Sequence, residues 1–395
     1  MVLNLGGESM IFRKGELFCG PGGLALGAKV ASFMENGEEY GVQHAWANDY
    51  DYSACRTFAR NICESGEEII TDDENDILQG NASIICKDVR KLNIELLPPI
   101  DAFTFGFPCN DFSNVGEKKG FNGEFGPLYT YGVSVLRHHS PQWFLAENVG
   151  GLSNANDGNA FTKILQDLSD ENLNEYGGYN IVPHYYKFEE YGVPQARHRI
   201  IIVGIRRDLG LTFNVPAPTT PRKEEYKTSR HVFENGNYDF EGNVKDALYN
   251  NELTKHPAST IRRLEAIPPG ENAWYEGIPE ELRLKVKGAK LSNIYKRLHP
   301  DMPAYTVTGS GGGGTHMYHY DIPRALTNRE RARLQTFPDS YVFEGGKEDV
   351  RRQIGMAVPP MGANIIIRAI LNTFAGIEYD SVPAKWNIDD IKDIT

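Results

Sequence analysis

Short apolar runs alternate with helical patterns through the first two hundred residues of the chain. The runs that we predict as strands are 15–19, 44–49, 82–87, 101–107, 143–149 and 199–205. The helical patterns between them are 23–36, 52–63, 128–139 and 159–174. Alternation of this kind is typical of βαβ units, so we expect an α/β fold with a mostly parallel sheet.

The alternating pattern breaks at about residue 206. Residues 214–325 are rich in Pro, Gly, Asn and Tyr and hold few regular runs, which indicates a separate, irregular domain. That stretch contains the segment GSGGGG at 309–314, which no packed helix or strand would tolerate. We therefore predict three parts, with boundaries at 1–205, 206–323 and 324–395.

Regular patterns return in the third part. Thr327 followed by Glu330 is a capping-box signature that opens a helix. A second helix is expected from about residue 360.

Composition excludes several classes of protein. The chain has 395 residues, 40% hydrophobic and 24% charged, as soluble globular proteins have. It shows no apolar run long enough for a bilayer and no secretory pattern at its N-terminus, so we expect a cytoplasmic protein without a membrane role. Five cysteines without a C-x-x-C pair indicate neither a disulfide framework nor a zinc site.

The net charge of −12 argues at first against a nucleic-acid partner, because phosphate contacts need Lys and Arg. The uneven distribution of charge weakens that objection. The stretch 283–297 holds six basic residues and no acidic one. A basic face on an acidic body is compatible with DNA, although a solvated charged helix explains this stretch equally well.

The segment FCGPGGLALG at 18–27 is a glycine-rich turn between a predicted strand and a predicted helix. Such turns bring backbone N–H groups close to a nucleotide-like ligand, although they are common in any α/β protein. The spacing G-x-G-G differs from the G-x-G-x-x-G of dinucleotide sites. Asp49 ends the next strand and could accept hydrogen bonds from ribose hydroxyls, with Tyr50 beside it to stack on adenine. An aspartate at a strand end is also often only a helix cap.

The segment GFPCNDFS at 106–113 follows an apolar strand directly. Ligands of open α/β folds bind at the carboxyl edge of the sheet, which is where this segment puts the thiol of Cys109. A lone cysteine is by default a buried structural residue. The Pro, Asn, Asp and Ser around Cys109 are loop residues and favour an accessible thiol.

Two more segments carry charge to the same edge. AENV at 146–149 ends an apolar strand, and an acid such as Glu147 is costly to bury unless it is protonated or paired. QARHR at 195–199 puts Arg197 and Arg199 on one side of an extended segment. Without the other motifs, these two would be read as ordinary surface arginines.

Cysteine, glutamate and arginine together suit one reaction. Carbon 5 of cytosine is a poor nucleophile, but addition of a thiolate to carbon 6 gives an enamine whose carbon 5 can attack a methyl sulfonium. A carboxyl group on N3 and the exocyclic amine, with an arginine on O2, would assist that addition. Cys109, Glu147, Arg197 and Arg199 are therefore our candidate catalytic residues.

The chain resembles the cytosine-5 DNA methyltransferases of bacterial restriction–modification systems, whose motifs occur here in the family's order. Outside 214–300 the resemblance covers nearly all of the chain, and it includes PRALTNRERARLQTFPD at 323–339 and QIGMAVPP at 353–360. It implies a Rossmann-like class I methyltransferase fold that binds S-adenosyl-L-methionine. The positions that it assigns to this cofactor are Phe18, Gly20, Gly22, Gly23, Asp49, Tyr50, Asp88, Val89, Pro108, Leu128, Met356 and Ala357.

The resemblance also implies how the protein meets its substrate. The target cytosine would swing out of double-stranded DNA into the pocket that contains Cys109, under a loop at about 109–125. Residues 206–323 would be the target-recognition domain, between the catalytic domain at 1–205 and the segment 324–395 that returns to it. One departure is Met356, which stands where the family commonly has Asn, so a hydrogen bond to the cofactor is missing or replaced. We expect a monomer that needs no metal.

Three alternatives share part of this pattern. A tRNA cytosine-5 methyltransferase would use the same catalytic residues, but a recognition region of over a hundred residues favours DNA. A catalytically inactive DNA-binding regulator would not need Cys109, Glu147, Arg197 and Arg199. An NAD-dependent oxidoreductase explains the glycine turn alone. His316 and His319 near Asp321 lack further partners for a metal, so we interpret them as structural or DNA-facing.

Overall fold

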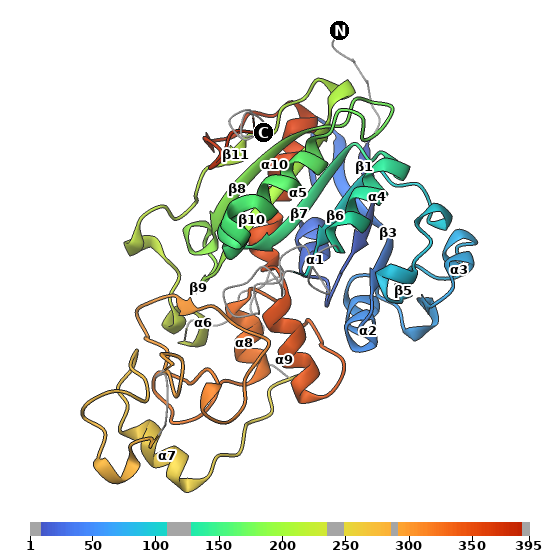
Figure 1. The fold of residues 1–395 in the computed structure, drawn as a ribbon. Helices are drawn as coiled ribbons and strands as arrows, with labels where there is room; N and C mark the ends of the chain where they lie inside the picture. The colour runs from blue at the N-terminus through green and yellow to red at the C-terminus, as the bar shows by residue number, and fades with distance from the viewer. Residues whose placement is uncertain (1–8, 109–127, 235–248, 286–290, 389–395) are drawn as a thin grey trace. The chain divides into compact units, whose positions relative to one another are not determined.

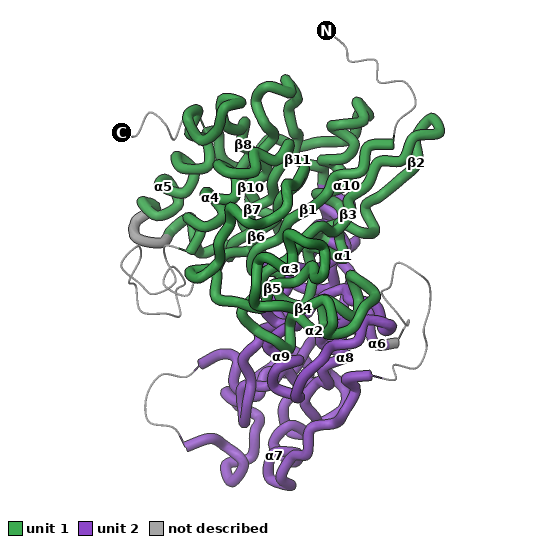
Figure 2. The backbone as a smooth tube through the Cα atoms, turned by 90° about the vertical axis from the view of Figure 1, so that its right-hand side faces the viewer, with its two compact units in different colours: residues 1–187, 198–217, 362–395 green, residues 188–197, 218–361 purple. Residues whose placement is uncertain are grey.

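The computed structural model describes residues 9–108, 128–234, 249–285 and 291–388, except for the side chains of 155–157 and 234. Two compact units make up the chain (Figure 2). Unit 1 consists of Met1–Lys187, His198–Ala217 and Gly362–Thr395, and unit 2 consists of Phe188–Arg197 and Pro218–Met361. The predicted boundary near 206 is a different division of the chain and stays a prediction.

A nine-stranded sheet forms the centre of unit 1 within the described ranges (Figure 1). Its strands are β1 (Met10–Leu17), β2 (Phe33–Glu35), β3 (Glu38–Asp49), β4 (Ile70–Thr71), β5 (Ile84–Cys86), β6 (Ala102–Gly106), β7 (Trp143–Val149), β8 (Tyr179–Lys187) and β10 (His198–Arg206). The order is β4-β5-β3-β1-β6-β7-β10-β8, with β2 paired to β3. The pairs from β4 to β7 are parallel, while β7-β10, β10-β8 and β2-β3 are antiparallel. The predicted fold class, α/β with a mostly parallel sheet, is confirmed.

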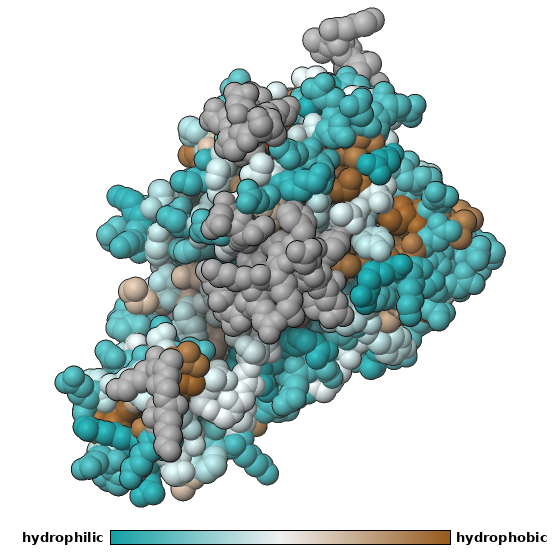
Figure 3. Space-filling view, in the orientation of Figure 1, coloured by the Kyte–Doolittle hydropathy of each residue, from teal (hydrophilic) through white to brown (hydrophobic). Residues whose placement is uncertain are grey.

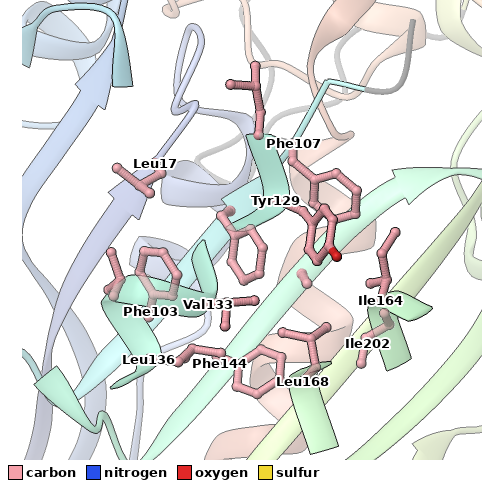
Figure 4. Packing of buried hydrophobic residues seen from close by; sticks show 14 of the residues in the cluster. Leu17, Phe103, Phe107, Tyr129, Val133, Leu136, Phe144, Ile164, Leu168 and Ile202 are labelled. Atoms are coloured by element: carbon pink, nitrogen blue, oxygen red, sulfur yellow. The ribbon is translucent and has the colours of Figure 1, made fainter. Parts of the chain in front are cut away.

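Helices cover both faces of this sheet. The helices that lie wholly in unit 1 are α1 (Gly23–Val30), α2 (Tyr52–Asn61), α3 (Glu74–Leu78), α4 (Tyr129–His139) and α5 (Asn159–Ser169). On the α4 and α5 face, Leu17 belongs to a cluster with buried residues of both helices, and Figure 4 shows part of that packing. On the other face, Phe12 packs edge-on against Phe374 of α10 (Pro360–Ala375), with 4.8 Å between the ring centroids. Alternate residues of β1 therefore serve two separate cores.

In this unit one predicted helix was too long, and one long strand was not predicted. The helix predicted for 23–36 ends at Val30, and Phe33–Glu35 is instead strand β2. The reason is Asn36-Gly37, whose positive φ angles of 51° and 85° make the tight turn of a β2–β3 hairpin. Strand β8 was not predicted, because Pro183 interrupts its apolar pattern.

The described residues of unit 2 have little regular structure. Its helices are α6 (Ser229–Glu234), α7 (Ala258–Glu265), α8 (Asn328–Leu334) and α9 (Lys347–Met356). Strands β9 (Gln195–Ala196) and β12 (Ala304–Tyr305) pair with each other, and the short pair β11 (Val215–Pro216) and β13 (Ser381–Val382) belongs to unit 1. The predicted capping box is confirmed, since Thr327 caps the N-terminus of α8 and the Glu330 carboxylate accepts from its backbone N–H.

Buried arginines hold the loops of unit 2 together. The guanidinium of Arg297 donates to the backbone oxygens of Leu264, Ile267, His319 and Tyr320. A buried carbonyl without a donor is costly, and loops lack the donors that a helix or sheet provides. Arginine side chains supply those donors here.

One described stretch, Lys347–Ala375, is apolar and long enough to cross a membrane by length and composition alone. However, α9 ends at Met356 and α10 begins at Pro360. Of its apolar window, 72% is buried, as in the core helix of a soluble protein. Among the coloured residues of the face that Figure 3 draws, hydrophilic ones outweigh hydrophobic ones.

Candidate active site

The turn between β1 and α1 has an unusual backbone. Phe18, Gly20 and Gly22 all have positive φ angles, of 55°, 51° and 90°. A phenylalanine in this region is uncommon and indicates a backbone that its surroundings constrain. Gly22 stands at the N-cap of α1. Because glycine has no side chain, it cannot cap the first N–H groups of this helix. The N–H groups of Gly20 and Gly22 already donate to Asp49 Oδ2 and Cys19 O, so it is the first turn of α1 that offers backbone donors to a ligand.

Asp49, at the end of β3, lies against this turn. Its Oδ2 accepts from the N–H of Gly20 at 2.8 Å, and its Oδ1 accepts from the N–H of Asp51 at 2.9 Å. Burial raises the pKa of Asp49 to about 6. Each carboxylate oxygen has two lone pairs, so Asp49 can hold the turn and still accept from a ligand.

The next predicted cofactor positions differ in exposure. Tyr50 is 70% exposed, as a ring must be to stack on a ligand. Asp88 caps the short helical turn Val89–Lys91 and accepts from Arg90, which lowers the pKa of that carboxyl. Val89 is buried, and so is Leu128, which precedes α4 and joins the core cluster.

The ends of β6 and β7 lie side by side in parallel register. Gly106 of β6 is paired with Glu147 of β7, and a Cβ on Gly106 would lie only 3.0 Å from Glu147 Oε2. The side-chain amide of Asn148 donates to the carbonyl of Phe107 at 3.2 Å. Asn148 thus fixes the backbone that leads through Pro108 to Cys109. Pro108 is the last described residue here, and Cys109 itself lies outside the described residues.

Glu147 has a partner on the neighbouring strand. Arg199 Nε lies 2.7 Å from Glu147 Oε1, and each side chain is 11% exposed. Because Glu147 is directly opposite Ile201 in the β7–β10 register, Arg199 stands on the same face two positions along. The pair offsets the cost of burying the acid, so burial alone no longer argues for a catalytic role. What the geometry adds is a carboxylate and a guanidinium close together at the carboxyl end of β7.

Arg197 does not join that pair. It belongs to unit 2, is 1% exposed, and donates to the backbone oxygens of Val307 (3.0 Å), Gly355 (3.0 Å) and Ala357 (2.9 Å). The expectation that Arg197 and Arg199 share one side of an extended segment is therefore wrong. The segment is not one strand, since β9 ends at Ala196 and β10 begins at His198. Arg197 is a positioning residue for the loops of unit 2.

Gln195 was missed by the sequence analysis. Its side chain accepts from the N–H of Val307 and donates to Leu334 O and Gln335 Oε1. It is fully buried beside Arg197 and has the same task of binding loop backbone. The sequence signal that could have identified Gln195 was its position two residues before Arg197.

The last predicted cofactor positions lie at the end of α9. Met356 is 63% exposed, whereas Ala357 is buried and its carbonyl accepts from Arg197 and Gln335. The exposed thioether of Met356 stands where an amide was expected. The carbonyl of Ala357 is thus already bound within the protein, whereas the side chain of Met356 is accessible to a ligand.

Of the two histidines considered as metal ligands, His319 has its ring engaged with other groups of the protein. The ring nitrogen Nδ1 of His319 accepts from the backbone N–H groups of Asp321 and Ile322, and its ring stacks on Phe233. Among the described residues, no group of three or more His, Cys, Asp or Glu could hold a metal ion.

Comparison with known proteins identifies the family. Residues 12–372 match the family model described as C-5 cytosine-specific DNA methylase. The Type II methyltransferase M.BbvI of Brevibacillus brevis is 57% identical over 388 residues, which cover 97% of this chain and 96% of that protein. The Type II methyltransferase M.NgoFVII of Neisseria gonorrhoeae is 39% identical over 96% of this chain and 91% of that protein.

Solved structures share the fold. One named for a DNA modification methyltransferase encoded within an E. coli prophage has a TM-score of 0.66 at 23% identity, and the match covers 93% of this chain and all of that one. Another, of a Spodoptera frugiperda DNMT2 mutant, has a TM-score of 0.54 at 14% identity over 91% of this chain and 99% of that one. At these identities the likeness concerns the fold alone. The matches in sequence carry the identification: the chain belongs to the C-5 cytosine-specific DNA methylases and is a DNA (cytosine-5-)-methyltransferase.

Proposed function

We propose that the chain methylates carbon 5 of a cytosine within a specific sequence of double-stranded DNA, as the modification enzyme of a restriction–modification system. The observation that supports this most is the ion pair of Glu147 with Arg199 at the end of β7, beside the end of β6 that continues into Cys109. The relatives named Type II methyltransferases support the restriction–modification role.

The reaction would use Cys109 as the nucleophile. Its thiolate adds to carbon 6 of cytosine, forming an S–C6 bond while the electron pair of the C5–C6 double bond moves to carbon 5. Carbon 5 takes the methyl group, and the donor is left as a neutral thioether. Carbon 5 then gives up its proton to water, and the S–C6 bond breaks to restore the aromatic ring and the thiolate. A free thiol is mostly protonated near neutral pH, so the surroundings of Cys109 must favour the thiolate.

Glu147 and Arg199 would bind the base during this addition. The carboxyl group of Glu147 fits N3 and the exocyclic amine, and the guanidinium of Arg199 fits the O2 oxygen, where charge develops. Their ion pair holds both side chains in place before the base arrives. Arg197, with its guanidinium bound to three carbonyls, would act only through the loops that it holds.

Enzymes of this family use S-adenosyl-L-methionine as the methyl donor. The residues present fit that group. Positive φ angles at Gly20 and Gly22 let the backbone of the turn pass close to a ligand, and Asp49 lies at the adjoining strand end with lone pairs for ribose hydroxyls. Tyr50 would cover the adenine, with Phe18, Gly23, Asp88, Val89, Pro108, Leu128, Met356 and Ala357 completing the site. When bound, the sulfonium supplies an electrophilic methyl group.

The remaining parts of the proposal concern the substrate and the organisation of the chain. The cytosine is flipped out of the duplex, at an unpairing cost of a few kcal/mol. Residues 206–323 form the target-recognition domain, between a catalytic domain at 1–205 and the returning segment 324–395. The protein acts as a monomer in the cytoplasm and needs no metal.

A methyl-transfer assay tests the proposal. Duplex DNA and tRNA are each incubated with the protein and tritiated S-adenosylmethionine, alongside the variant Cys109→Ser. We expect label in duplex DNA, little in tRNA, and a loss of at least about 10³-fold in the variant. Label in tRNA alone would favour the tRNA methyltransferase instead, and label in neither polymer would refute the proposal. Bisulfite sequencing of the product then gives the recognition sequence, and methylation without sequence preference would contradict the restriction–modification role.

A further inference from the structure

Arg331 in α8 differs from the other buried arginines of unit 2. Its side chain is 1% exposed, and none of its three guanidinium nitrogens has a hydrogen-bond partner. Arg297 and Arg329 are also buried, but each donates to several backbone oxygens. A buried cation without an acceptor is costly, because it loses its hydration and gains nothing in return. The site around Arg331 therefore lacks an acceptor.

The charged groups that act on Arg331 include the cation Arg351 and the anion Glu330. Burial, and next the positive charge of Arg351, lower the pKa of Arg331 to about 10, so it stays charged at neutral pH. Burial and then Arg351 and Arg331 together lower the pKa of His316 to about 4, with smaller contributions from His256 and Lys347. The acid nearby, Glu330, is bound to Arg324 through both carboxylate oxygens. The excess positive charge suits an anion.

The glycine segment 309–314 covers this basic cluster. Arg351 Nη1 donates to the carbonyl of Gly311, and the hydroxyl of Tyr318 donates to the carbonyl of Gly313 at 2.7 Å. A Cβ on Gly311 would lie 3.6 Å from Arg351 Cδ and 3.7 Å from His316 Nδ1. Ser310, Gly312 and Gly313 are exposed on the outer side. The segment is thus a thin cover, without side chains at its glycines, between solvent and the side chains of Arg351 and His316.

We propose that Arg331 and Arg351, with the glycine segment 309–314 that covers Arg351, form a site for a phosphate of the DNA backbone. The inference rests on the proposed duplex substrate. A guanidinium donates two parallel hydrogen bonds to a phosphate, and the negative charge offsets that of both arginines. The absence of side chains on the glycines lets the sugar–phosphate backbone approach closely. The segment must shift to admit the phosphate, since the nitrogens of Arg331 are sealed from solvent.

The test compares the full-length protein with Arg331→Met and Arg331→Lys. Binding of fluorescent duplex DNA is measured by anisotropy over a range of salt concentrations. Each phosphate contact contributes about 0.9 to the slope of log affinity against log salt. We expect Arg331→Met to lower that slope by about 1 and to weaken binding about tenfold at moderate salt, while Arg331→Lys keeps most of the slope.

Thermal unfolding separates a binding role from a structural one. Without DNA, Arg331→Met should be as stable as the wild type or more stable, because it removes an uncompensated buried charge. The matched change Arg297→Met should lower stability, because four carbonyls lose their donor. Inorganic phosphate should raise the melting temperature of the wild type more than that of Arg331→Met.

Three results would overturn the inference. One is an unchanged salt slope in Arg331→Met while the wild type still methylates DNA, which would leave the proposed function intact. A second is a loss of stability equal to that of Arg297→Met, which would make Arg331 a structural clamp. A third is stabilisation by inorganic phosphate without any change in the DNA slope, which would mean a site for free phosphate.

Discussion

The two units bury their charged side chains in different ways. In unit 1, buried charges of opposite sign are paired on neighbouring positions of the sheet, as with Glu147 and Arg199 or Lys14 and Glu16. Unit 2 also holds ion pairs, Arg324–Glu330 and Arg333–Asp339, but its arginines Arg197 and Arg297 are buried against backbone carbonyls. A sheet satisfies its own backbone and leaves charged groups for chemistry, whereas irregular loops need arginines to satisfy their carbonyls. The same residue type thus has a different role in each unit.

Replacing Arg197 by Met should produce the largest loss of stability. Three buried carbonyls would lose a charged donor, at about 1 kcal/mol or more each, so we expect the free energy of unfolding to fall by roughly 3 kcal/mol or more. Urea denaturation measures it, with the exposed Arg262→Met as a control that should change stability by less than about 0.5 kcal/mol. Unchanged stability with lost activity would return Arg197 to the catalytic role that the sequence indicated.

Replacing Glu147 by Gln should affect catalysis more than folding. The amide keeps the shape of the side chain but loses the charge that pairs with Arg199, and we expect kcat to fall about 10²–10³-fold. Arg199→Met is the matched change on the other partner. If the pair acts as one unit, the double variant will be little worse than either single one. A loss of stability as large as that of Arg197→Met, with kcat kept, would make the pair a structural feature.

The smallest effect that we expect is a pH dependence of the affinity for the cofactor. Burial raises the pKa of Asp49 to about 6, so the free protein protonates this carboxyl as pH falls through 6. A protonated carboxyl is a weaker acceptor of hydrogen bonds from ribose hydroxyls. The affinity for S-adenosylmethionine should therefore fall by up to about tenfold per pH unit below 6. Calorimetry at several pH values measures it. Asp49→Asn should bind more weakly at pH 7 and lack this dependence, and an equal dependence in the variant would exclude Asp49 as its source.

The sequence predicted unit 1 far better than unit 2. Apolar strands such as β7 and β10 have a pattern that local preferences and burial both favour, so they were found within a residue or so. Unit 2 depends on side-chain hydrogen bonds between residues over a hundred positions apart, such as Arg197 to Val307. The periodicity of apolar residues in the sequence does not indicate such contacts. It also does not indicate the bend after Ala196 that separates Arg197 from Arg199.

The candidate site was predicted by residue type and order, and less well by role. The sequence selected Glu147, Arg197 and Arg199 as candidates, because charged residues at strand ends are unusual. It did not indicate that Glu147 already has a partner in Arg199, or that Asn148 fixes the backbone of Phe107. Those facts depend on strand register, which the sequence of a single chain does not determine.

The role of Cys109 is the central claim, and trapping its adduct tests it most directly. The protein is incubated with S-adenosylmethionine and duplex DNA that contains 5-fluorocytosine, in which fluorine replaces the proton that must leave carbon 5. We predict a covalent protein–DNA complex whose linked peptide, found by mass spectrometry, contains Cys109, and no complex with Cys109→Ser. A complex through another cysteine, or a wild type that methylates ordinary DNA but forms no complex with the fluorinated duplex, would contradict the account.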